Sequence, residues 1–267
     1  MSTQAYATEL IDAAAHARSV PTFTGRDPAF DMAQAYAIAE RVHRARVARG
    51  ERPVGRKIGF TNRTIWAEYG VYQPIWGHVY DTTVTYAPGG RAELALAGLV
   101  APRIEPEVVL HFRSPPPVTN DEPALLACID WIAHGFEIVQ SPFPEWRFKV
   151  EDTVAAGGLH GALVIGTPVP VSDIADCARK LREFRIALWR DGAIRAEGAG
   201  ANVLDSPLAA FAHLARVLDR LPQFLPVGVG EVVTTGTLTP ALPVKAGETW
   251  RTTLEGIELP GLTIALR

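Results

Sequence analysis

Cysteine is nearly absent from this chain of 267 residues, which contains only Cys128 and Cys177. Two cysteines without CxxC or Cys/His spacing exclude a disulfide framework and a thiolate metal site. The chain also has no run of about 18 apolar residues, and no basic region followed by an apolar run at its N-terminus. These absences predict a soluble protein of a reducing compartment, the cytoplasm, with no membrane partner.

An excess of charge of either sign is missing too. The 26 basic and 29 acidic residues leave a net charge of -3, and the isoelectric point is near 6.2. This balance gives no electrostatic reason to expect nucleic acid as a partner. A small soluble ligand is the expected partner, and the length suffices for one large domain with a substantial core.

Hydrophobic spacing divides the chain into a helical start and a β-rich remainder. Before residue 50 the apolar residues recur at helical spacing, with Asp31 as an N-cap and Gly50 as a stop. From Gly55 onward, Gly and Pro clusters separate short β-branched runs, at 104–112, 159–165, 184–190, 231–238 and 261–266. The pattern predicts an α+β protein with a helical region over 1–54 and a β-rich region over 55–267, or one continuous domain.

Three local signals stand out within the β-rich region. Asp191-Gly192 lies between two β-type segments and predicts a hairpin turn. Ser206-Pro207 has the character of an N-cap and first helical residue, which predicts a helix from Ser206 to about Leu221. A shorter helix is expected from Asp121 to Trp131.

Two carboxylates occupy the apolar segment 104–112. Strand alternation would bring Glu105 and Glu107 to one face, where burial of both is costly unless a cation neutralises them or one takes a proton. Glu137 adds a third acid in a second apolar run, 131–139. Three acids in apolar strands indicate a hard divalent ion, Mg²⁺ or Mn²⁺. A solvated strand face is the simpler alternative for the Glu-x-Glu pattern alone.

Pro106 stands between these two glutamates. Because proline lacks the N–H that a ladder needs, it predicts a strand that is at a sheet edge or bulged at this position.

Several blocks, in this order and spacing, resemble the fumarylacetoacetate hydrolase superfamily, and within it the 2-keto-4-pentenoate hydratase and 4-oxalocrotonate decarboxylase branch. They are GRKIGFT at 55–61, RIEPEVVLHF at 103–112, GFEIVQS at 135–141, DTVA at 152–155 and TTGTLTP at 234–240. The resemblance implies a helical N-terminal region packed on a mixed β-sandwich roll. It also implies a Mg²⁺ or Mn²⁺ ion held by Glu105, Glu107 and Glu137, and an active-site lysine at Lys57. We expect a homo-oligomer.

Lys57 lies between Gly55 and Gly59. We expect these glycines to let the backbone approach a ligand closely and the lysine to contact a substrate carboxylate or transfer a proton. A lysine that is partly desolvated near a metal can have a lowered pKa, which would suit the second role.

The chain departs from the family pattern after residue 155. It has Ala-Gly-Gly-Leu-His-Gly at 156–161, where the hydratases and decarboxylases usually have Asp-Asn-Ala-Ser-Ser-Gly. His160, in the last serine position, is a candidate acid/base, with a structural hydrogen-bonding role equally open. Asp81 could orient Lys57 or cap a turn. Arg147 and Lys149 could meet a second substrate carboxylate or be solvated.

The resemblance implies a divalent-metal-dependent lyase acting on a small 2-oxo or 2-hydroxydienoic acid. Our interpretation is a hydratase that adds water to a 2-hydroxy-2,4-dienoate in aromatic-compound catabolism. The alternatives are a 4-oxalocrotonate-type decarboxylase, an acylpyruvate-type C–C hydrolase and a non-catalytic binding protein.

Overall fold

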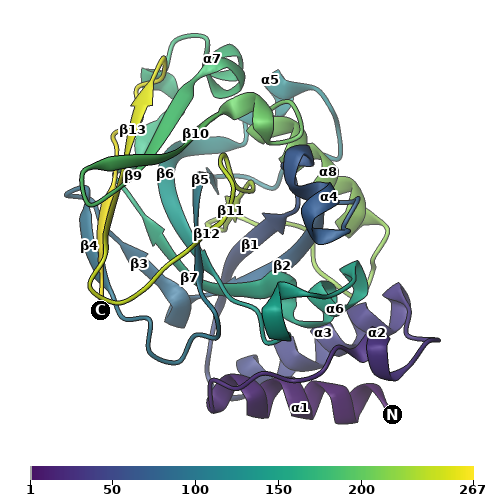
Figure 1. The fold of residues 1–267 in the computed structure, drawn as a ribbon. Coiled ribbons are helices and arrows are strands. Elements are labelled where there is room, and N and C mark those ends of the chain that lie inside the picture. The colour runs from purple at the N-terminus through teal and green to yellow at the C-terminus, as the bar shows by residue number, and fades with distance from the viewer. Residues whose placement is uncertain (1) are drawn as a thin grey trace.

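Two mixed β-sheets form the body of the protein, and helices cover them (Figure 1). The structure is a computed structural model and describes residues 2–267. The larger sheet has the order β2-β1-β11-β5-β6-β7-β3, with β12 paired to β5 and β8 paired to β6. The smaller sheet has the order β10-β9-β13-β14-β4. This is the α+β architecture that the sequence predicted.

The strands of the larger sheet are β1 (Pro53–Gly59), β2 (Ile75–Tyr80), β3 (Val84–Tyr86), β5 (Arg103–Phe112), β6 (Ile129–Val139), β7 (His160–Ile165), β8 (Val169–Pro170), β11 (Val232–Thr234) and β12 (Leu242–Pro243). Those of the smaller sheet are β4 (Arg91–Leu94), β9 (Arg185–Arg190), β10 (Ala193–Ala199), β13 (Thr249–Glu255) and β14 (Thr263–Leu266).

The α-helices are α1 (Thr3–Ala15), α2 (Phe23–Arg26), α3 (Met32–Ala48), α4 (Trp66–Tyr69), α5 (Glu122–Leu126), α6 (Val150–Ala155), α7 (Cys177–Glu183) and α8 (Pro207–Asp219). Six short 3₁₀ turns complete the described chain: η1 (Arg63–Ile65), η2 (Asp81–Thr83), η3 (Pro144–Trp146), η4 (Gly157–Leu159), η5 (Val171–Asp173) and η6 (Gly200–Asn202). No helix in residues 2–267 is long and apolar enough to cross a membrane.

The N-terminal helices begin and end where their capping residues predict. The Asp31 carboxylate accepts a hydrogen bond from Gln34 N at the start of α3, and Gly50 follows the helix with a φ of +95°. Their apolar faces pack on residues from the second half of the chain, so that Tyr6 and Phe23 share a buried cluster with Phe143 and Leu159. The helical region therefore shares this buried cluster with the β-rich region.

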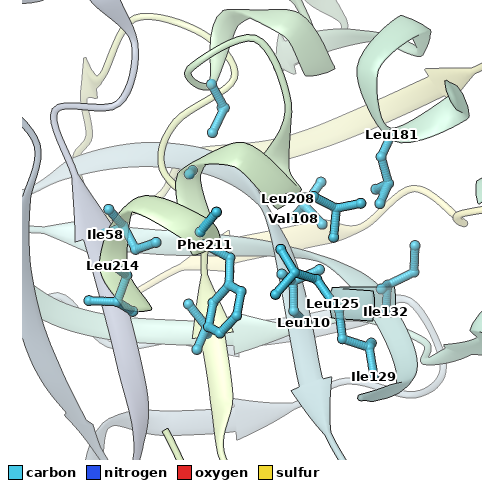
Figure 2. Packing of buried hydrophobic residues seen from close by; sticks show 14 of the residues in the cluster. Ile58, Val108, Leu110, Leu125, Ile129, Ile132, Leu181, Leu208, Phe211 and Leu214 are labelled. Atoms are coloured by element: carbon cyan, nitrogen blue, oxygen red, sulfur yellow. The ribbon is translucent and has the colours of Figure 1, made fainter. Parts of the chain in front are cut away.

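One face of the larger sheet is covered by α8 and by the smaller sheet. Leu208, Phe211 and Leu214 of α8 lie over Val108 and Leu110 of β5 (Figure 2). Farther along, the same face packs on the smaller sheet through a second cluster, which includes Ile104, Phe136, Ile138, Leu188, Trp250 and Ile264. Alternation along β5 therefore directs the glutamates to the opposite face of the sheet.

Most predicted elements are present, and two are wrong in part. The Asp191-Gly192 hairpin joins β9 to β10, and Ser206 caps α8 by accepting from Leu208 N. The helix expected from Asp121 to Trp131 ends at Leu126, because Ile129 already belongs to β6. Of the run 231–238, only Val232–Thr234 forms a strand.

Of the two alternatives predicted for Pro106, the edge strand is wrong. β5 is a central strand, paired with β6 on one side and with β11 and β12 on the other, and its register shift lies at His111/Phe112. The Pro106 carbonyl accepts from Leu238 N at 2.9 Å, so the missing N–H faces segment 235–238, between β11 and β12. The ladder is interrupted there, and a proline is tolerated.

Candidate metal centre and active site

The three predicted glutamates converge on neighbouring central strands. Glu105 and Glu137 are directly opposed in the antiparallel β5–β6 pair, and Glu107 stands opposite Gly135. One carboxylate oxygen from each glutamate lies within 4.8 Å of the other two. Glu107 and Glu137 have no exposed surface, whereas Glu105 lines a small pocket.

Within residues 2–267, two of the buried carboxylate oxygens have no hydrogen-bond donor. Gly236 N donates to Glu107 Oε2 at 2.7 Å, but Glu107 Oε1 has no partner among the described residues. Glu137 Oε2 lies 3.2 Å from Lys57 Nζ without forming a hydrogen bond of good geometry. Buried charged acceptors without partners are costly. The donor set therefore fits a cation that prefers oxygen ligands, such as Mg²⁺ or Mn²⁺.

Burial and mutual repulsion shift the ionisation of these acids. Burial raises the pKa of Glu105 to about 7, against the opposing charge of Lys57. Burial, with the charges of Glu137 and Glu105, also raises the pKa of Glu107 well above its usual value. For Glu137 burial acts in the same direction, but Lys57 and His160 outweigh it and lower the pKa. Without a cation, the centre thus favours proton uptake by Glu105 and Glu107.

Lys57 projects from β1 into the same centre. Its side chain is only 2% exposed. Burial alone would lower its pKa, but the charges of Glu137, Glu105 and Glu107 more than compensate, and the pKa lies above its ordinary value. The expected lowering of the pKa is therefore wrong for the metal-free protein, in which Lys57 is an ammonium ion.

The glycines around Lys57 serve chain packing more than ligand approach. A Cβ on Gly55 would lie 2.1 Å from the Val232 carbonyl oxygen, so Gly55 permits the parallel pairing of β1 with β11. Gly59 does line the pocket. A third glycine, Gly158 in η4, packs directly on the lysine stem, since its Cβ would be 2.9 Å from Lys57 Cδ.

A cavity of about 20 Å³ opens next to Lys57 and Glu105. Its wall is otherwise mostly apolar and includes Phe60, Ile65, Tyr69, Val139, Trp146 and Leu159. Phe60, Trp146 and Leu159 have φ values of +54°, +57° and +63°, a left-handed conformation that costs free energy for such side chains. Strained residues cluster at functional sites, which supports this cavity as the active-site pocket.

Arg103 supports this wall from behind, a role that no sequence pattern predicts. Arg103 Nη1 donates to the Tyr69 hydroxyl, and its guanidinium lies 4.4 Å from the centre of the Trp146 ring. Burial raises the pKa of Tyr69. The helical spacing of Trp66, Tyr69, Tyr72 and Trp76 predicts a packed helical face or a subunit contact, whereas Tyr69 lines the pocket.

His160 reaches the centre through Glu137. Its Nδ1 lies 2.8 Å from Glu137 Oε1, and its Nε2 lies 2.8 Å from Thr83 Oγ1. Of segment 156–161, Gly158 and Leu159 are the described residues that line the small pocket. His160 instead lines a second cavity of about 120 Å³, between the N-terminal helices and β2. An acid/base role for His160 stays a prediction that its position does not favour.

Asp81 lies at a distance from the centre. It starts η2 and accepts hydrogen bonds from Arg52 N and Arg52 Nε, both at 2.9 Å. Lys57 is paired with Gly77 on β2, four residues before Asp81, a separation of roughly 13 Å along a strand. The prediction that Asp81 orients Lys57 is wrong, because Glu137 is the acid that pairs with Lys57, whereas Asp81 pairs with Arg52, immediately before β1.

Arg147 and Lys149 are also outside the pocket. The Arg147 side chain is 85% exposed and forms an ion pair with Glu145. Lys149 is exposed, and its backbone N–H donates to Asp152 at the start of α6. The expectation that they bind a substrate carboxylate is therefore wrong for this conformation; the loop that carries them presents Trp146 to the pocket instead.

Known proteins are similar to this chain in both sequence and fold. A sequence profile of the fumarylacetoacetate (FAA) hydrolase C-terminal family matches residues 74–260. The 2-hydroxyhexa-2,4-dienoate hydratase of Comamonas testosteroni is 33% identical over 254 residues, which cover 93% of this chain and 92% of the relative. The 2-keto-4-pentenoate hydratase 1 of Dechloromonas aromatica (strain RCB) is 34% identical over 262 residues, with coverages of 96% and 95%.

Solved structures agree with this relationship. The 4-oxalocrotonate decarboxylase from Pseudomonas putida G7, complexed with magnesium and adipate, superposes with a TM-score of 0.88 at 25% identity and covers 99% of this chain and 97% of that chain. A fumarylpyruvate hydrolase from Pseudomonas aeruginosa, in complex with Mn²⁺ and pyruvate, shares the fold at a TM-score of 0.61 and 17% identity, with coverages of 79% and 88%. The chain belongs to the fumarylacetoacetate hydrolase family.

Proposed function

We propose that this protein is a divalent-metal-dependent hydratase that adds water to a 2-hydroxy-2,4-dienoate. The observation that carries the proposal is the convergence of three carboxylates and a buried lysine at the base of an apolar pocket. The names of the hydratase relatives, which match this chain over more than nine-tenths of its length, point to the same reaction class. A non-catalytic binding protein would have no need for this buried charge cluster.

Glu105, Glu107 and Glu137 would hold the metal, and Mg²⁺ and Mn²⁺ are our candidates. Such an ion, when bound, would act as a Lewis acid and would stabilise negative charge that develops on the C2 oxygen of a 2-hydroxydienoate. Two buried oxygens that accept no hydrogen bond, Glu107 Oε1 and Glu137 Oε2, support this assignment, although Lys57 lies beside the second one. So does the opening of the pocket beside Glu105, which leaves room for a ligand from the solvent side.

Lys57 is the proton-bearing group at the base of the pocket. We assign its ammonium a hydrogen bond to the C2 oxygen of the substrate, where it stabilises negative charge. The C2 hydroxyl then loses its proton and C5 gains one, so that the remaining double bond lies between C3 and C4, conjugated with the C2 carbonyl. Water adds its oxygen at C4 and a proton at C3, which yields a 4-hydroxy-2-oxo acid.

The apolar wall favours a hydratase over a decarboxylase of the 4-oxalocrotonate type. A dicarboxylic substrate needs a cationic partner for its second carboxylate. The charged residues that line the pocket are Lys57 and Glu105, both at its base. Arg103 stands behind the wall, engaged with the Tyr69 hydroxyl and the Trp146 ring. A dienoate with a hydrogen or an alkyl group at C5 suits this wall better.

The hydrolase alternative requires a histidine–acid pair that activates water. His160 and Glu137 are such a pair by distance, but the second ring nitrogen of His160 is close to Thr83. The position of His160, outside the lining of the small pocket, also disfavours the activation of water beside a substrate.

The pocket has to enlarge before it can accept the substrate. About 20 Å³ is space for a water-sized molecule, and a 2-hydroxypentadienoate has eight non-hydrogen atoms. Phe60 and Trp146, with their strained backbone conformations, are the wall residues that we expect to move. Binding energy from the substrate would then drive the opening.

A substrate panel tests the proposal. Purified protein with Mg²⁺ or Mn²⁺ is mixed with 2-hydroxypenta-2,4-dienoate, 2-hydroxyhexa-2,4-dienoate, 2-oxohex-3-enedioate and an acylpyruvate. We expect loss of the dienol absorbance with the first two and formation of the 4-hydroxy-2-oxo acid, detected by mass spectrometry. Release of CO₂ from the enedioate as the faster reaction, or cleavage of the acylpyruvate, would replace the hydratase assignment.

We also propose that the protein is a cytoplasmic homo-oligomer. Both cysteines are free, which suits a reducing compartment. Leu225 and Val118 are 78% and 52% exposed and line one apolar groove beside α8, a surface suited to a second subunit. Light scattering of the wild type and of Leu225→Glu tests the assembly, and a monomeric wild type would contradict it.

A further inference from the structure

His160 is linked to Glu137 and Thr83 in a way that the metal centre itself does not require. The imidazole lies between the two side chains, 2.8 Å from Glu137 Oε1 on one side and 2.8 Å from Thr83 Oγ1 on the other. Its side chain is only 3% exposed. The ring is therefore held at both nitrogens, and it bridges a metal-site carboxylate on β6 to the η2 turn after β2.

A β-bulge directs His160 to this position. Glu137 is opposite Leu163 and Ile138 is opposite Ala162, but Val139 is opposite His160 instead of Gly161. Regular alternation would place His160 on the face away from Glu137, and one extra residue in the strand reverses this. A Cβ on Gly161 would lie 2.6 Å from the Ile138 carbonyl oxygen, so the bulge requires glycine there.

Thr83 in turn is anchored to the backbone. Its hydroxyl donates to the Tyr80 carbonyl at 2.9 Å, which fixes the position of Oγ1 relative to β2. Thr83 Oγ1 is thus a rigid contact for His160 Nε2, and the ring cannot turn about its Cβ–Cγ bond without losing both contacts. Glu137 Oε1 is held in consequence, which leaves Oε2 directed toward Lys57.

We propose that His160, supported by Thr83, is a positioning residue that orients Glu137 for metal binding. The inference rests on the proposed function, because it assumes that Glu137 is a metal ligand. Groups that hydrogen-bond to metal ligands fix the ligand orientation, and their removal typically lowers metal affinity by about 10- to 100-fold. The bulge in β7 that brings His160 beside Glu137 is the feature of this chain that makes the support possible.

Matched substitutions at both positions test the proposal. His160→Leu removes both nitrogens at similar size, whereas His160→Asn retains an amide donor near the position of Nδ1. Thr83→Val removes the hydroxyl and keeps the branched shape, and Thr83→Ser restores it. The metal-free proteins are titrated with Mn²⁺ by calorimetry, and the zero-field splitting of the bound ion is recorded by electron paramagnetic resonance.

We expect His160→Leu to weaken Mn²⁺ binding by about 10- to 100-fold and to change the resonance spectrum. His160→Asn should recover part of the affinity. Thr83→Val should weaken binding by a few-fold, because the ring remains but loses one support, and Thr83→Ser should bind more tightly than Thr83→Val. If His160→Leu does not fold, the Thr83 pair decides the question.

Wild-type Mn²⁺ affinity in both His160 variants, or in Thr83→Val when the histidine variants do not fold, would overturn the proposal. A second result would also overturn it: His160→Asn and His160→Leu both lose turnover completely while their metal affinity is unchanged. His160 would then act on the substrate. Glu105→Gln separates this result from failure of the proposed function. If Glu105→Gln also binds Mn²⁺ like the wild type, the metal centre itself is wrongly assigned.

Discussion

Lys57 and Glu137 form a buried ion pair in which Nζ lies 3.2 Å from Oε2. The two residues come from non-adjacent strands, β1 and β6, and neither side chain is more than 2% exposed. Because the same carboxylate is also a candidate metal ligand, the lysine charge and a bound cation compete for one oxygen. Turnover and metal binding should therefore respond differently when the lysine charge is removed.

Lys57→Met keeps most of the aliphatic stem and removes the ammonium. We expect turnover to fall by about 10²- to 10³-fold, as for loss of a donor that stabilises a developing oxyanion. Metal affinity should fall less or rise, because a charge that repels the cation is gone. Steady-state kinetics and Mg²⁺ calorimetry measure the two effects. The exposed Lys245→Met is the control, and an unchanged turnover number in Lys57→Met would assign Lys57 a structural role only.

Replacement of the glutamates separates the metal from the fold. Glu105→Gln, Glu107→Gln and Glu137→Gln should each weaken Mg²⁺ or Mn²⁺ binding and abolish turnover, since each loses one charged oxygen at constant size. For Glu105→Gln the metal-free protein should be as stable as the wild type or more so, because burial opposes ionisation of that carboxyl. The measurement is thermal unfolding with and without metal.

At a metal concentration of 100 Kd, metal binding should raise the free energy of unfolding of the wild type by about 2.7 kcal/mol. The same concentration should raise that of the variants by less. Variants that all gain as much as the wild type would contradict the metal assignment.

Gly157 and Gly158 are a matched pair in η4. Both have a positive φ, +66° and +70°, but a Cβ on Gly157 would meet nothing within 4 Å, whereas one on Gly158 would press on Lys57 Cδ at 2.9 Å. Gly157→Ala should cost only the left-handed backbone penalty, about 1 kcal/mol. Gly158→Ala should lower the free energy of unfolding by more than Gly157→Ala does. It should also lower kcat, because the added methyl group displaces Lys57. Denaturant unfolding and kinetics on both variants measure this, and equal kcat values would refute the proposed contact.

His78 gives the protein a specific acid sensitivity. Burial, with the charges of Arg56, His43 and Arg46, lowers the pKa of His78 from 6.5 to about 2. Between these values the unfolded chain holds a proton that the native protein lacks, so stability falls as the pH drops below 6.5. The loss from this residue is up to about 1.4 kcal/mol per pH unit, or up to about 2 kcal/mol at pH 5.

His78→Phe should reduce this slope, and urea unfolding between pH 5 and 8 measures it. Part of the slope should remain, because burial also lowers the pKa of the stacked His43. A variant with the same pH dependence as the wild type would show that His78 is solvated enough to be protonated in the native state.

Local pattern in the sequence was sufficient for much of the fold and for the centre of the site. Strand alternation placed Glu105 and Glu107 on one face, and Glu137, the acid in the apolar run 131–139, lies beside them. Capping by Asp31 and the hairpin at Asp191-Gly192 were likewise predictable. These features depend on residues that are close in sequence, or on a periodicity that the chain itself carries.

The position of each element relative to the others was decided by the tertiary structure alone. Pro106 is accommodated in a central strand because the regular hydrogen-bond ladder between β5 and the distant segment 235–238 is interrupted at this residue. Arg147, near the pocket in sequence, faces solvent, while Thr83, which no pattern marks, supports Glu137 through His160. The physical reason is that sequence periodicity determines which face of a strand a residue occupies, whereas the strands paired beside it and the turns packed over that face determine what its side chain meets.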